Sequence, residues 1–369
     1  MSKVHVVTAA RTHRANSNML LHEMISGSLK QEAAIQTSCS FSFLMELLGN
    51  RTNGTIFMSH SLSSKCQVNL MTVLILSRGN CRLSHGISCY MKAMATANLM
   101  VLVFTVLVSQ IIRNHFPGSP LNYTPICQLN IFLQGLSLHL TVWFTITFTF
   151  DRFVAICCHK LKARYCTERM ANVVITTVTV VNIMINIPLP FRYEAAYVAN
   201  SVQWGCHAIT NYHTSPGWAA HRWVTNISNS FVPIPLLLLM KSLTTRHILM
   251  ASRARRALKS SSSASAVKMG SDPELKSRKT SIVLLFTISG CFVMLSAPIT
   301  VIDVCIGVTQ TVAVQDSNSL YLAFRVTFLM MCFSSCTNTC IYALTQRRFR
   351  EEMKNLAKSP SSLLCKLHK

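Results

Sequence analysis

Six long apolar segments constrain this chain more than any other feature of its sequence. A helix needs about 20 mostly apolar residues to cross the hydrocarbon core of a membrane, and six stretches meet that length. They are residues 86–112, 126–150, 170–191, 224–249, 281–306 and 320–344. So many segments of this length in succession would be unusual as core helices of a soluble protein. The sequence therefore predicts an all-α membrane protein.

Composition supports this reading. Half of the 369 residues are hydrophobic and only 13% are charged, whereas about a quarter of the residues are charged in a typical soluble protein. The net charge of +23 would suit a nucleic-acid binder, but the long apolar segments argue against a nucleic-acid partner. Residues 1–21 lack the apolar core of a cleavable signal peptide, so we expect the spans themselves to direct the chain into the lipid bilayer.

A seventh, weaker candidate span lies at residues 68–77, which are apolar but cover only half of a membrane. The residues before it are rich in serine and include Lys65, which is costly near a bilayer centre. We therefore expect an aberrant or truncated first helix. The predicted organisation is an extracellular or non-native segment at 1–65, a seven-helix domain at 66–345, and an amphipathic helix with a cytoplasmic tail at 346–369.

The distribution of lysine and arginine predicts the orientation of the spans, because short cytoplasmic loops carry an excess of these residues. Basic residues are concentrated between the second and third long segments, between the fourth and fifth, and after the sixth. This pattern places the C-terminus in the cytoplasm of a multi-pass plasma-membrane protein. The sequons at Asn50 and Asn53 would then be glycosylated outside the cell if the half-length segment crosses.

Phe349, Met353 and Leu356 recur at helical spacing among basic residues, as in a helix that lies on an anionic leaflet.

A short motif at the end of the second long segment indicates the family. Asp151, Arg152 and Phe153 stand at its cytoplasmic end, and Cys127 stands at its outer end. In this placement the residues resemble the rhodopsin-like (class A) G protein-coupled receptors, over residues 69–356. Residues 76–84, 246–249 and 337–342 further resemble the orphan subgroup of the probable G-protein coupled receptor 139, for which aromatic amino acid or peptide agonists are proposed.

The resemblance implies roles for several residues. Asp151 would hold Arg152 at rest, and Arg152 would turn on activation to receive the C-terminal helix of a Gα subunit; a plain charge pair at the membrane interface is the alternative. Cys206 would form a disulfide with Cys127. The residues implied in the switch and in G protein coupling are Asp151, Arg152, Phe153, Phe292, Pro298, Asn338 and Tyr342.

The sequence also departs from the family pattern. Asn98 replaces the usual aspartate of the second family span, which in many relatives binds Na⁺ together with residues equivalent here to Thr141, Ser334 and Asn338. Ser296 stands where a tryptophan is common, and Thr339 replaces a proline. Lys241 stands where the family usually has tyrosine or asparagine. A decayed receptor copy that no longer signals is therefore an alternative to a working receptor.

Four polar residues are candidates for the ligand pocket. Asn130 and Gln134 are four residues apart and share a helix face. Asp303 and Arg325 lie near the outer ends of the last two spans, where charged residues are functional candidates. They would bind the ammonium and carboxylate groups of an amino acid or a peptide terminus. An Asp303–Arg325 salt bridge that closes the mouth is the alternative.

Competing functions have little support in the sequence. Cys332, Cys336 and Cys340 share one helix face, but no histidine or carboxylate joins them, so helix packing is favoured over a metal site. We find no metalloprotease, phosphate-loop or serine-hydrolase motif, and expect neither enzymatic activity nor a cofactor. A transporter, the remaining class, would favour inverted repeats, which the sequence lacks.

Overall fold

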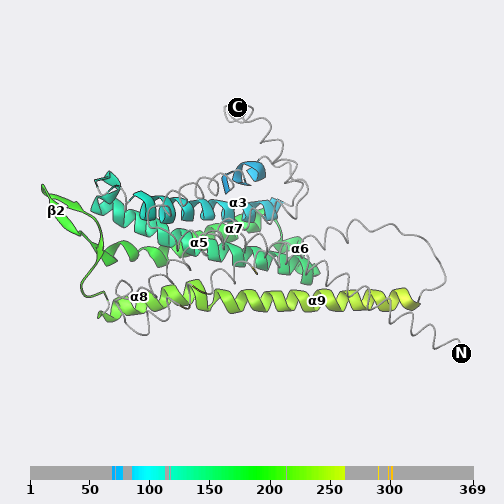
Figure 1. Cartoon of the computed structure of the whole chain (residues 1–369). Coiled ribbons are helices and arrows are strands. Elements are labelled where there is room, and N and C mark those ends of the chain that lie inside the picture. The colour runs from blue at the N-terminus through cyan, green and yellow to red at the C-terminus, as the bar shows by residue number, and fades with distance from the viewer. Residues whose placement is uncertain are drawn as a thin grey trace, which may run out of the picture. The chain divides into compact units, whose positions relative to one another are not determined.

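A computed structural model describes residues 69–70, 72–77, 85–112, 116, 118–212 and 214–261, together with 290, 298 and 301. Within these residues the chain is mostly helical (Figure 1). Four of the described helices are long and apolar enough to cross a membrane: His85–Ser109, Thr124–Cys157, Glu168–Arg192 and Pro216–His247. These correspond to the first four long apolar segments. The last two segments lie almost entirely outside the described residues.

The helices follow one another with short connections. The first span joins α3 (His85–Met100) to the π-helical segment η1 (Val101–Ile112). After the short turn η2 (Pro120–Asn122) comes α5 (Thr124–Cys157), and the small helix α6 (His159–Tyr165) leads to α7 (Glu168–Asn186) and the turn η3 (Leu189–Arg192). The fourth span consists of α8 (Pro216–Asn226), the π-helical η4 (Ile227–Phe231) and α9 (Pro233–Ser261).

The fourth helical stretch continues past the candidate span that ends at His247, and it is longer than the sequence suggests at both ends. It begins at Pro216, well before residue 224, because Pro216 occupies the favourable first turn and the following residues are amphipathic rather than uniformly apolar. It ends at Ser261, so the basic residues after position 249, expected in a connection, are helical instead. Alanine and arginine make up half of residues 250–261, and both are good helix formers.

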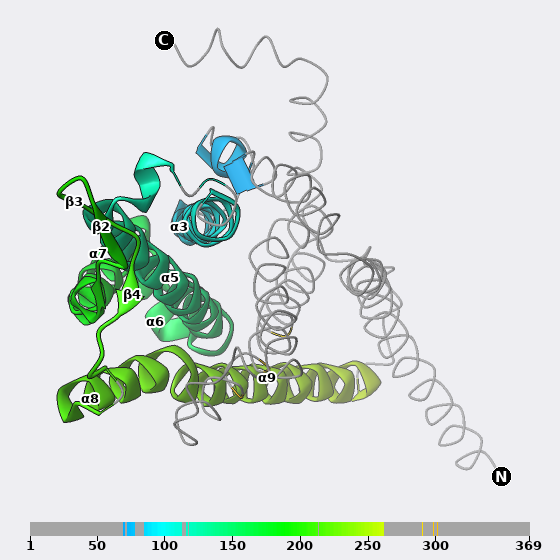
Figure 2. The same cartoon turned by 60° about the vertical axis from the view of Figure 1, so that its left-hand side comes forward.

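Helix α5 is the central element, because α3, α7 and α9 all pack against it (Figure 2). The main hydrophobic cluster joins Ile75 and Leu76 of the half-length segment at residues 68–77 to Tyr90 and Met94 of α3 and to Phe148 of α5. All of these side chains are buried. A smaller cluster links α5 to α9 through Val142, Ile146, Leu237 and Met240. Packing within these two clusters fixes the helices that carry the polar sites described below.

Helix α7 presents an apolar face outward. Val173, Val180, Val181 and Met184 are between 50% and 64% exposed. In water this would be a large exposed apolar face, whereas in a bilayer such side chains contact lipid chains. This face therefore fits the predicted membrane location.

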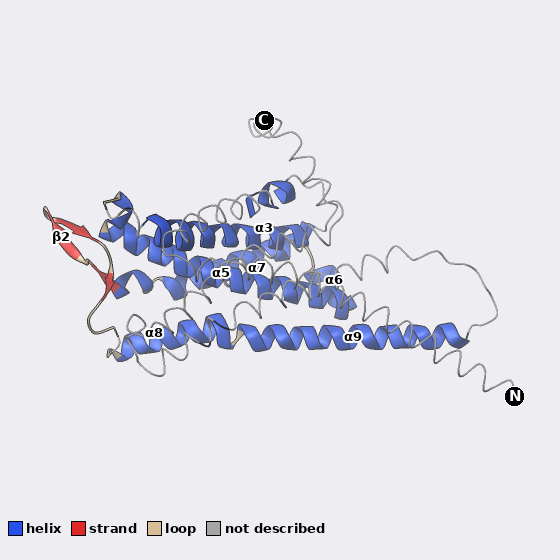
Figure 3. Cartoon of the chain, viewed as in Figure 1, coloured by secondary structure: helices blue, strands red, loops and turns tan. Residues whose placement is uncertain are grey.

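The connection between η3 and α8 forms a small antiparallel structure that the sequence did not lead us to expect (Figure 3). Strand β1 (Tyr193–Glu194) pairs with β4 (His207–Ala208), and β2 (Tyr197–Ala199) pairs with β3 (Val202–Trp204). Asn200 and Ser201 form the two-residue turn, with φ of 49° and 62°, as in hairpin turns that need left-handed residues. We call the end of the helices that carries these strands the hairpin end.

Candidate functional site

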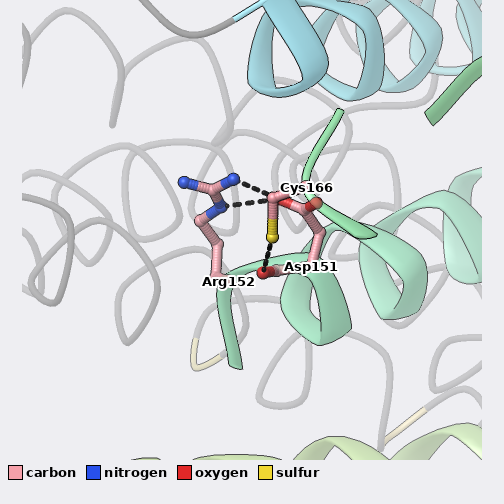
Figure 4. A network of polar contacts seen from close by, with 3 residues as sticks. All are labelled: Asp151, Arg152 and Cys166. Carbon is pink, nitrogen blue, oxygen red and sulfur yellow. Dashed lines mark hydrogen bonds and ion pairs between the residues drawn. The ribbon is translucent and has the colours of Figure 1, made fainter. Parts of the chain in front are cut away.

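Asp151 and Arg152 form a buried ion pair (Figure 4). The pair lies in the last turns of α5, at the end opposite the hairpin. The Arg152 Nε donates a hydrogen bond to Asp151 Oδ2 at 3.0 Å, and Nη2 of the same guanidinium also contacts that oxygen. The side chains of Asp151 and Arg152 are 2% and 10% exposed. We call this end of the helices the arginine end.

The geometry of the pair makes it suitable for a switch. Neighbouring residues of an α-helix point about 100° apart, so Arg152 must fold back along the helix to reach Asp151. Removing one partner of a buried ion pair typically costs about 3–5 kcal/mol, whereas a moving Arg152 would need only a replacement environment for its charge. The pair therefore holds Arg152 in one defined arrangement in this structure.

Groups from α5 itself and from α6 and the residue after it lie close to this pair. Cys166 Sγ lies 3.5 Å from the backbone oxygen of Asp151, and the Arg152 Cζ lies 6.0 Å from the centroid of the Phe148 ring. Burial and the charge of Asp151 raise the pKa of the Cys166 thiol from 9.0 to about 11. The same two causes raise the pKa of the Tyr165 hydroxyl. Both groups are therefore neutral near pH 7.

The surface around this end is basic. Helix α6 exposes Lys160, Lys162 and Arg164, and Arg246 is exposed on α9. Phe153 follows the ion pair and is half-buried. Exposed basic residues of α6 and α9 and the partly buried Phe153 thus accompany the buried arginine at this end of α5.

At the hairpin end, the strands are tied to the start of α5. Cys127 and Cys206 form a disulfide with 6.3 Å between their Cα atoms, the pairing that the family resemblance implies. Beside it, Thr124 Oγ1 donates to the Gly205 oxygen at 2.9 Å, and the Gly205 nitrogen donates to the Asn122 oxygen at 2.7 Å. Gly205 has φ of +72°, which favours glycine, and a Cβ atom there would lie 2.8 Å from the Ala196 Cβ. The hairpin is thereby fixed over the helix end.

The two described ligand-pocket candidates do share a face of α5, and both meet Ser109 of η1. Asn130 Nδ2 donates to Ser109 Oγ at 2.8 Å, and Ser109 Oγ lies 3.4 Å from Gln134 Oε1. Asn130 is buried, and its Oδ1 has no hydrogen-bond partner. A ligand group that donates a hydrogen bond would satisfy this oxygen.

Asn98 and Thr141 meet between α3 and α5, with Thr141 Oγ1 at 3.3 Å from Asn98 Oδ1. The Asn98 amide is buried, and its Nδ2 has no hydrogen-bond partner. Neither residue carries a negative charge to offset the cost of dehydrating a cation, and the unpaired Nδ2 is a donor. These two residues therefore supply no charge to hold a Na⁺ ion.

Several predicted site residues lie outside the described part of the chain: Asn50, Asn53, Phe292, Asp303, Arg325, Asn338 and Tyr342. Pro298 is described as helical and half-buried. Their proposed roles, and the predicted boundaries at residues 65 and 345, stay predictions.

Comparison with known families agrees with this architecture. The profile of the 7 transmembrane receptor (rhodopsin family) matches residues 68–342, well over half of the chain. The chain therefore belongs to the rhodopsin family of seven-transmembrane receptors. The predicted seven-helix membrane fold is confirmed, and family membership places the chain among multi-pass signalling receptors of the plasma membrane.

The sequence did not predict some of the residues that lie at the arginine end and at the hairpin end. Cys166 lies beside Asp151 only because α6 turns back toward α5, and nothing in the local sequence indicates that contact. Nothing in the sequence singled out Arg192 and Arg222, whose Cζ atoms both lie near the Tyr212 ring. Aromatic residues near both arginines were the signal that could have drawn attention to them.

Proposed function

We propose that this chain is a G protein-coupled receptor that transmits the binding of an extracellular ligand to a cytoplasmic heterotrimeric G protein. The observation that carries the proposal is the buried Asp151–Arg152 pair at the end of the central helix α5. A ligand at the other end would favour a helix arrangement in which Arg152 leaves Asp151. Arg152 would then contact the C-terminal helix of a Gα subunit, as a population shift between two states.

Two independent features support a membrane orientation with the arginine end in the cytoplasm and the hairpin end outside the cell. Exposed lysine and arginine residues gather at the arginine end, which favours the cytoplasm for that end. The Cys127–Cys206 disulfide lies at the hairpin end, and disulfides persist in oxidising compartments such as the cell exterior. With the arginine end inside, the C-terminus is cytoplasmic as well.

We further propose that the ligand is an amino acid or a peptide and that the chain belongs with the orphan subgroup named above. Asn130 and Gln134 supply amide groups in the polar cluster around Ser109, and Asp303 and Arg325 supply opposite charges. With an agonist in hand, Asp303→Asn and Arg325→Gln should each lower its potency at an unchanged surface level. An unaltered potency in both variants contradicts their role.

Guanine-nucleotide exchange tests the proposed coupling. The purified full-length receptor in nanodiscs is mixed with a panel of Gα subunits and Gβγ, and the rate of nucleotide exchange is measured with and without the receptor. We expect at least one Gα class to exchange faster with the wild-type receptor, and Arg152→Gln to remove most of that acceleration. Glu168→Gln, which changes an exposed carboxylate at the same end, is the matched control and should behave as wild type.

The receptor is compared with a coupling-competent reference receptor at an equal level of folded protein. If no Gα class exchanges faster under these conditions, the result favours a decayed receptor copy that no longer signals. Acceleration that Arg152→Gln leaves intact would contradict the assigned switch. Substrate flux into vesicles without any nucleotide exchange would favour a transporter.

A further inference from the structure

Helix α6 lies against the last turns of α5 at the arginine end (Figure 1). The Tyr165 ring stands edge-on to the Phe150 ring of α5, with 5.5 Å between the ring centroids. The Cys166 thiol, just after α6, contacts the backbone oxygen of Asp151. These two contacts fix which side of α6 faces α5.

The length of α5 places α6 at the membrane surface. Helix α5 has 34 residues, or about 51 Å at 1.5 Å per residue, whereas a bilayer with its headgroups is about 40–45 Å thick. The next candidate span begins at Glu168, soon after α6 ends at Tyr165. Because two spans enclose it so closely, α6 stays next to the lipid headgroups.

The cations of α6 have no carboxylate partner among the described residues. Lys160, Lys162 and Arg164 are all exposed. The carboxylates of Asp151 and Glu168, at the same end of the described chain, are each paired with another residue. The positive charge of this short helix is therefore available to an anion outside the chain.

The spacing of these cations puts two of them on one side of the helix. Residues four apart in an α-helix are neighbours on its surface, so Lys160 and Arg164 form a basic pair. Lys162 points to the opposite side, because each residue turns the helix by about 100°. Like charges at the spacing of the basic pair destabilise a helix. An anion that contacts both side chains would remove this repulsion.

An exposed apolar residue lies beside the basic pair. Leu161 is 54% exposed, follows Lys160 directly and lies about 60° from Arg164 around the helix axis. Helices in the plane of a membrane interface combine apolar side chains with basic ones. The exposed side of α6 therefore has the chemistry of a lipid-binding surface.

We propose that Lys160 and Arg164 bind the headgroup of a polyphosphoinositide, an anionic phospholipid that carries phosphate monoesters. A phosphate monoester carries about 1.5–2 negative charges at pH 7, so one headgroup can offset both cations. The Arg164 guanidinium matches two phosphate oxygens, and Lys160 supplies a point charge. Basic clusters beside the cytoplasmic end of a span attract such lipids. The inference goes beyond the proposed function, because neither the extracellular ligand nor the G protein takes part.

Hydrogen exchange of the α6 backbone tests the proposal at the site itself. The full-length receptor is placed in nanodiscs of phosphatidylcholine, either alone, with phosphatidylinositol bisphosphate, or with phosphatidylserine at the same total lipid charge. Mass spectrometry follows the backbone amides of residues 161–165. Relative to phosphatidylcholine alone, the bisphosphate lipid should slow their exchange at least about tenfold, which corresponds to about 1.4 kcal/mol. Phosphatidylserine should slow it by less than about threefold.

Lys160→Gln combined with Arg164→Gln should abolish the slowing by the bisphosphate lipid. The matched control is Lys162→Gln combined with Arg169→Gln, which removes two exposed charges at the same end and leaves the basic pair intact. The control should keep the slowing. Each variant is compared with itself in phosphatidylcholine alone, so that a change in the stability of the lipid-free helix does not enter the comparison.

The competing explanation is that the basic residues of α6 only set the orientation of the spans. No slowing by the bisphosphate lipid, or equal slowing by phosphatidylserine, overturns the proposal. Slowing that survives the loss of Lys160 and Arg164, or that the control variant loses, overturns it as well. Both leaflets of the nanodisc contain the same lipids and no G protein is present, so the result does not depend on the orientation of the receptor or on the proposed coupling.

Discussion

Asn98 shows how a single residue can change the ion binding expected between the helices of a receptor. Its side chain is buried beside Thr141, at a position where the family usually has an aspartate that takes part in Na⁺ binding. An amide differs from that carboxylate by one atom and by a full charge. Without an anion, nothing at these two residues offsets the dehydration of Na⁺.

We therefore predict that Na⁺ has little effect on the basal nucleotide exchange that the receptor promotes. Asn98→Asp should introduce a Na⁺-specific decrease, because the new carboxylate supplies the missing charge beside Thr141. Exchange is measured in NaCl, KCl and choline chloride at equal ionic strength. A Na⁺-specific shift in the wild-type receptor would disprove the assignment.

The alkylation rate of the Cys166 thiol depends on the charge of Asp151. Burial and Asp151 raise the pKa of the Cys166 thiol to about 11, and only the thiolate reacts with alkylating agents. Alkylation by iodoacetamide should therefore be slow at pH 8 and should keep rising with pH up to about 11. Asp151→Asn should speed alkylation at pH 8, since the variant removes a charge that raises this pKa.

The readout for Cys166 is the mass of the peptide that contains it, in permeabilised membranes after a timed reaction. Glu168→Gln serves as the control, because that carboxylate is exposed and is not among the charges that act on Cys166. Equal rates in Asp151→Asn and wild type would show that Asp151 does not influence the thiol.

At the scale of elements, α5 and α7 pack closely where polar side chains meet. Asn186 Nδ2 of α7 lies 2.9 Å from His139 Nδ1 of α5 and 2.7 Å from the Asn182 oxygen. A Cβ atom on Gly135 would lie 2.8 Å from Asn186 Oδ1 and would also meet Leu189. Glycine at position 135 thus allows the close approach that this network requires.

Gly135→Ala should destabilise the receptor. Overpacking typically costs about 1–3 kcal/mol, and the better helix propensity of alanine returns about 1 kcal/mol, so we expect a net loss of up to about 2 kcal/mol. Thermal unfolding of the purified receptor measures it as a lower Tm. Gly118→Ala is the matched control, because a Cβ atom there meets nothing within 4 Å. A Tm for Gly135→Ala equal to that of the control would contradict the packing account.

The half-length segment at residues 68–77 packs like an ordinary receptor helix. Asn69, Ile75 and Leu76 are buried against the receptor, and the family match begins at residue 68. The polar residues before it, including Lys65, would still have to cross the membrane for residues 1–65 to reach the outside. We predict that this crossing is inefficient, since a lysine near the bilayer centre costs about 2.5–3.5 kcal/mol.

Glycosylation of Asn50 and Asn53 measures the crossing directly. The chain is translated with microsomes, and the size shift removed by endoglycosidase is quantified. We expect little modification of these two sequons, beside efficient modification of a control sequon engineered in the loop at Asn122. Efficient modification of Asn50 and Asn53 would show that the segment crosses despite its sequence.

At the scale of the whole molecule, local patterns predicted the spans better than they predicted contacts between them. Runs of apolar residues indicate a membrane helix without knowledge of its neighbours, and the first four long segments do correspond to long helices. The pairing of Cys127 with Cys206 followed only from family resemblance. The start of α8 at Pro216 was missed because its first turns are amphipathic and carry no continuous apolar signal.

The approach of Arg192 and Arg222 to the Tyr212 ring could not be predicted for a different reason. These residues come from η3, from α8 and from the connection between these two elements, and only the tertiary fold brings them together. Asp151 and Arg152 are the opposite case, since they are adjacent in the chain and their contact needs only one helix.

The basal exchange rate of Asp151→Asn relative to wild type tests most directly whether Asp151 restrains Arg152. The asparagine keeps the size of the side chain but removes the charge that holds the guanidinium, so the active arrangement becomes more populated. We predict a basal rate about tenfold higher at equal amounts of folded receptor, which corresponds to about 1.4 kcal/mol between the two states. A basal rate equal to or below that of wild type, in a variant that folds normally, would contradict the role of this pair as the switch.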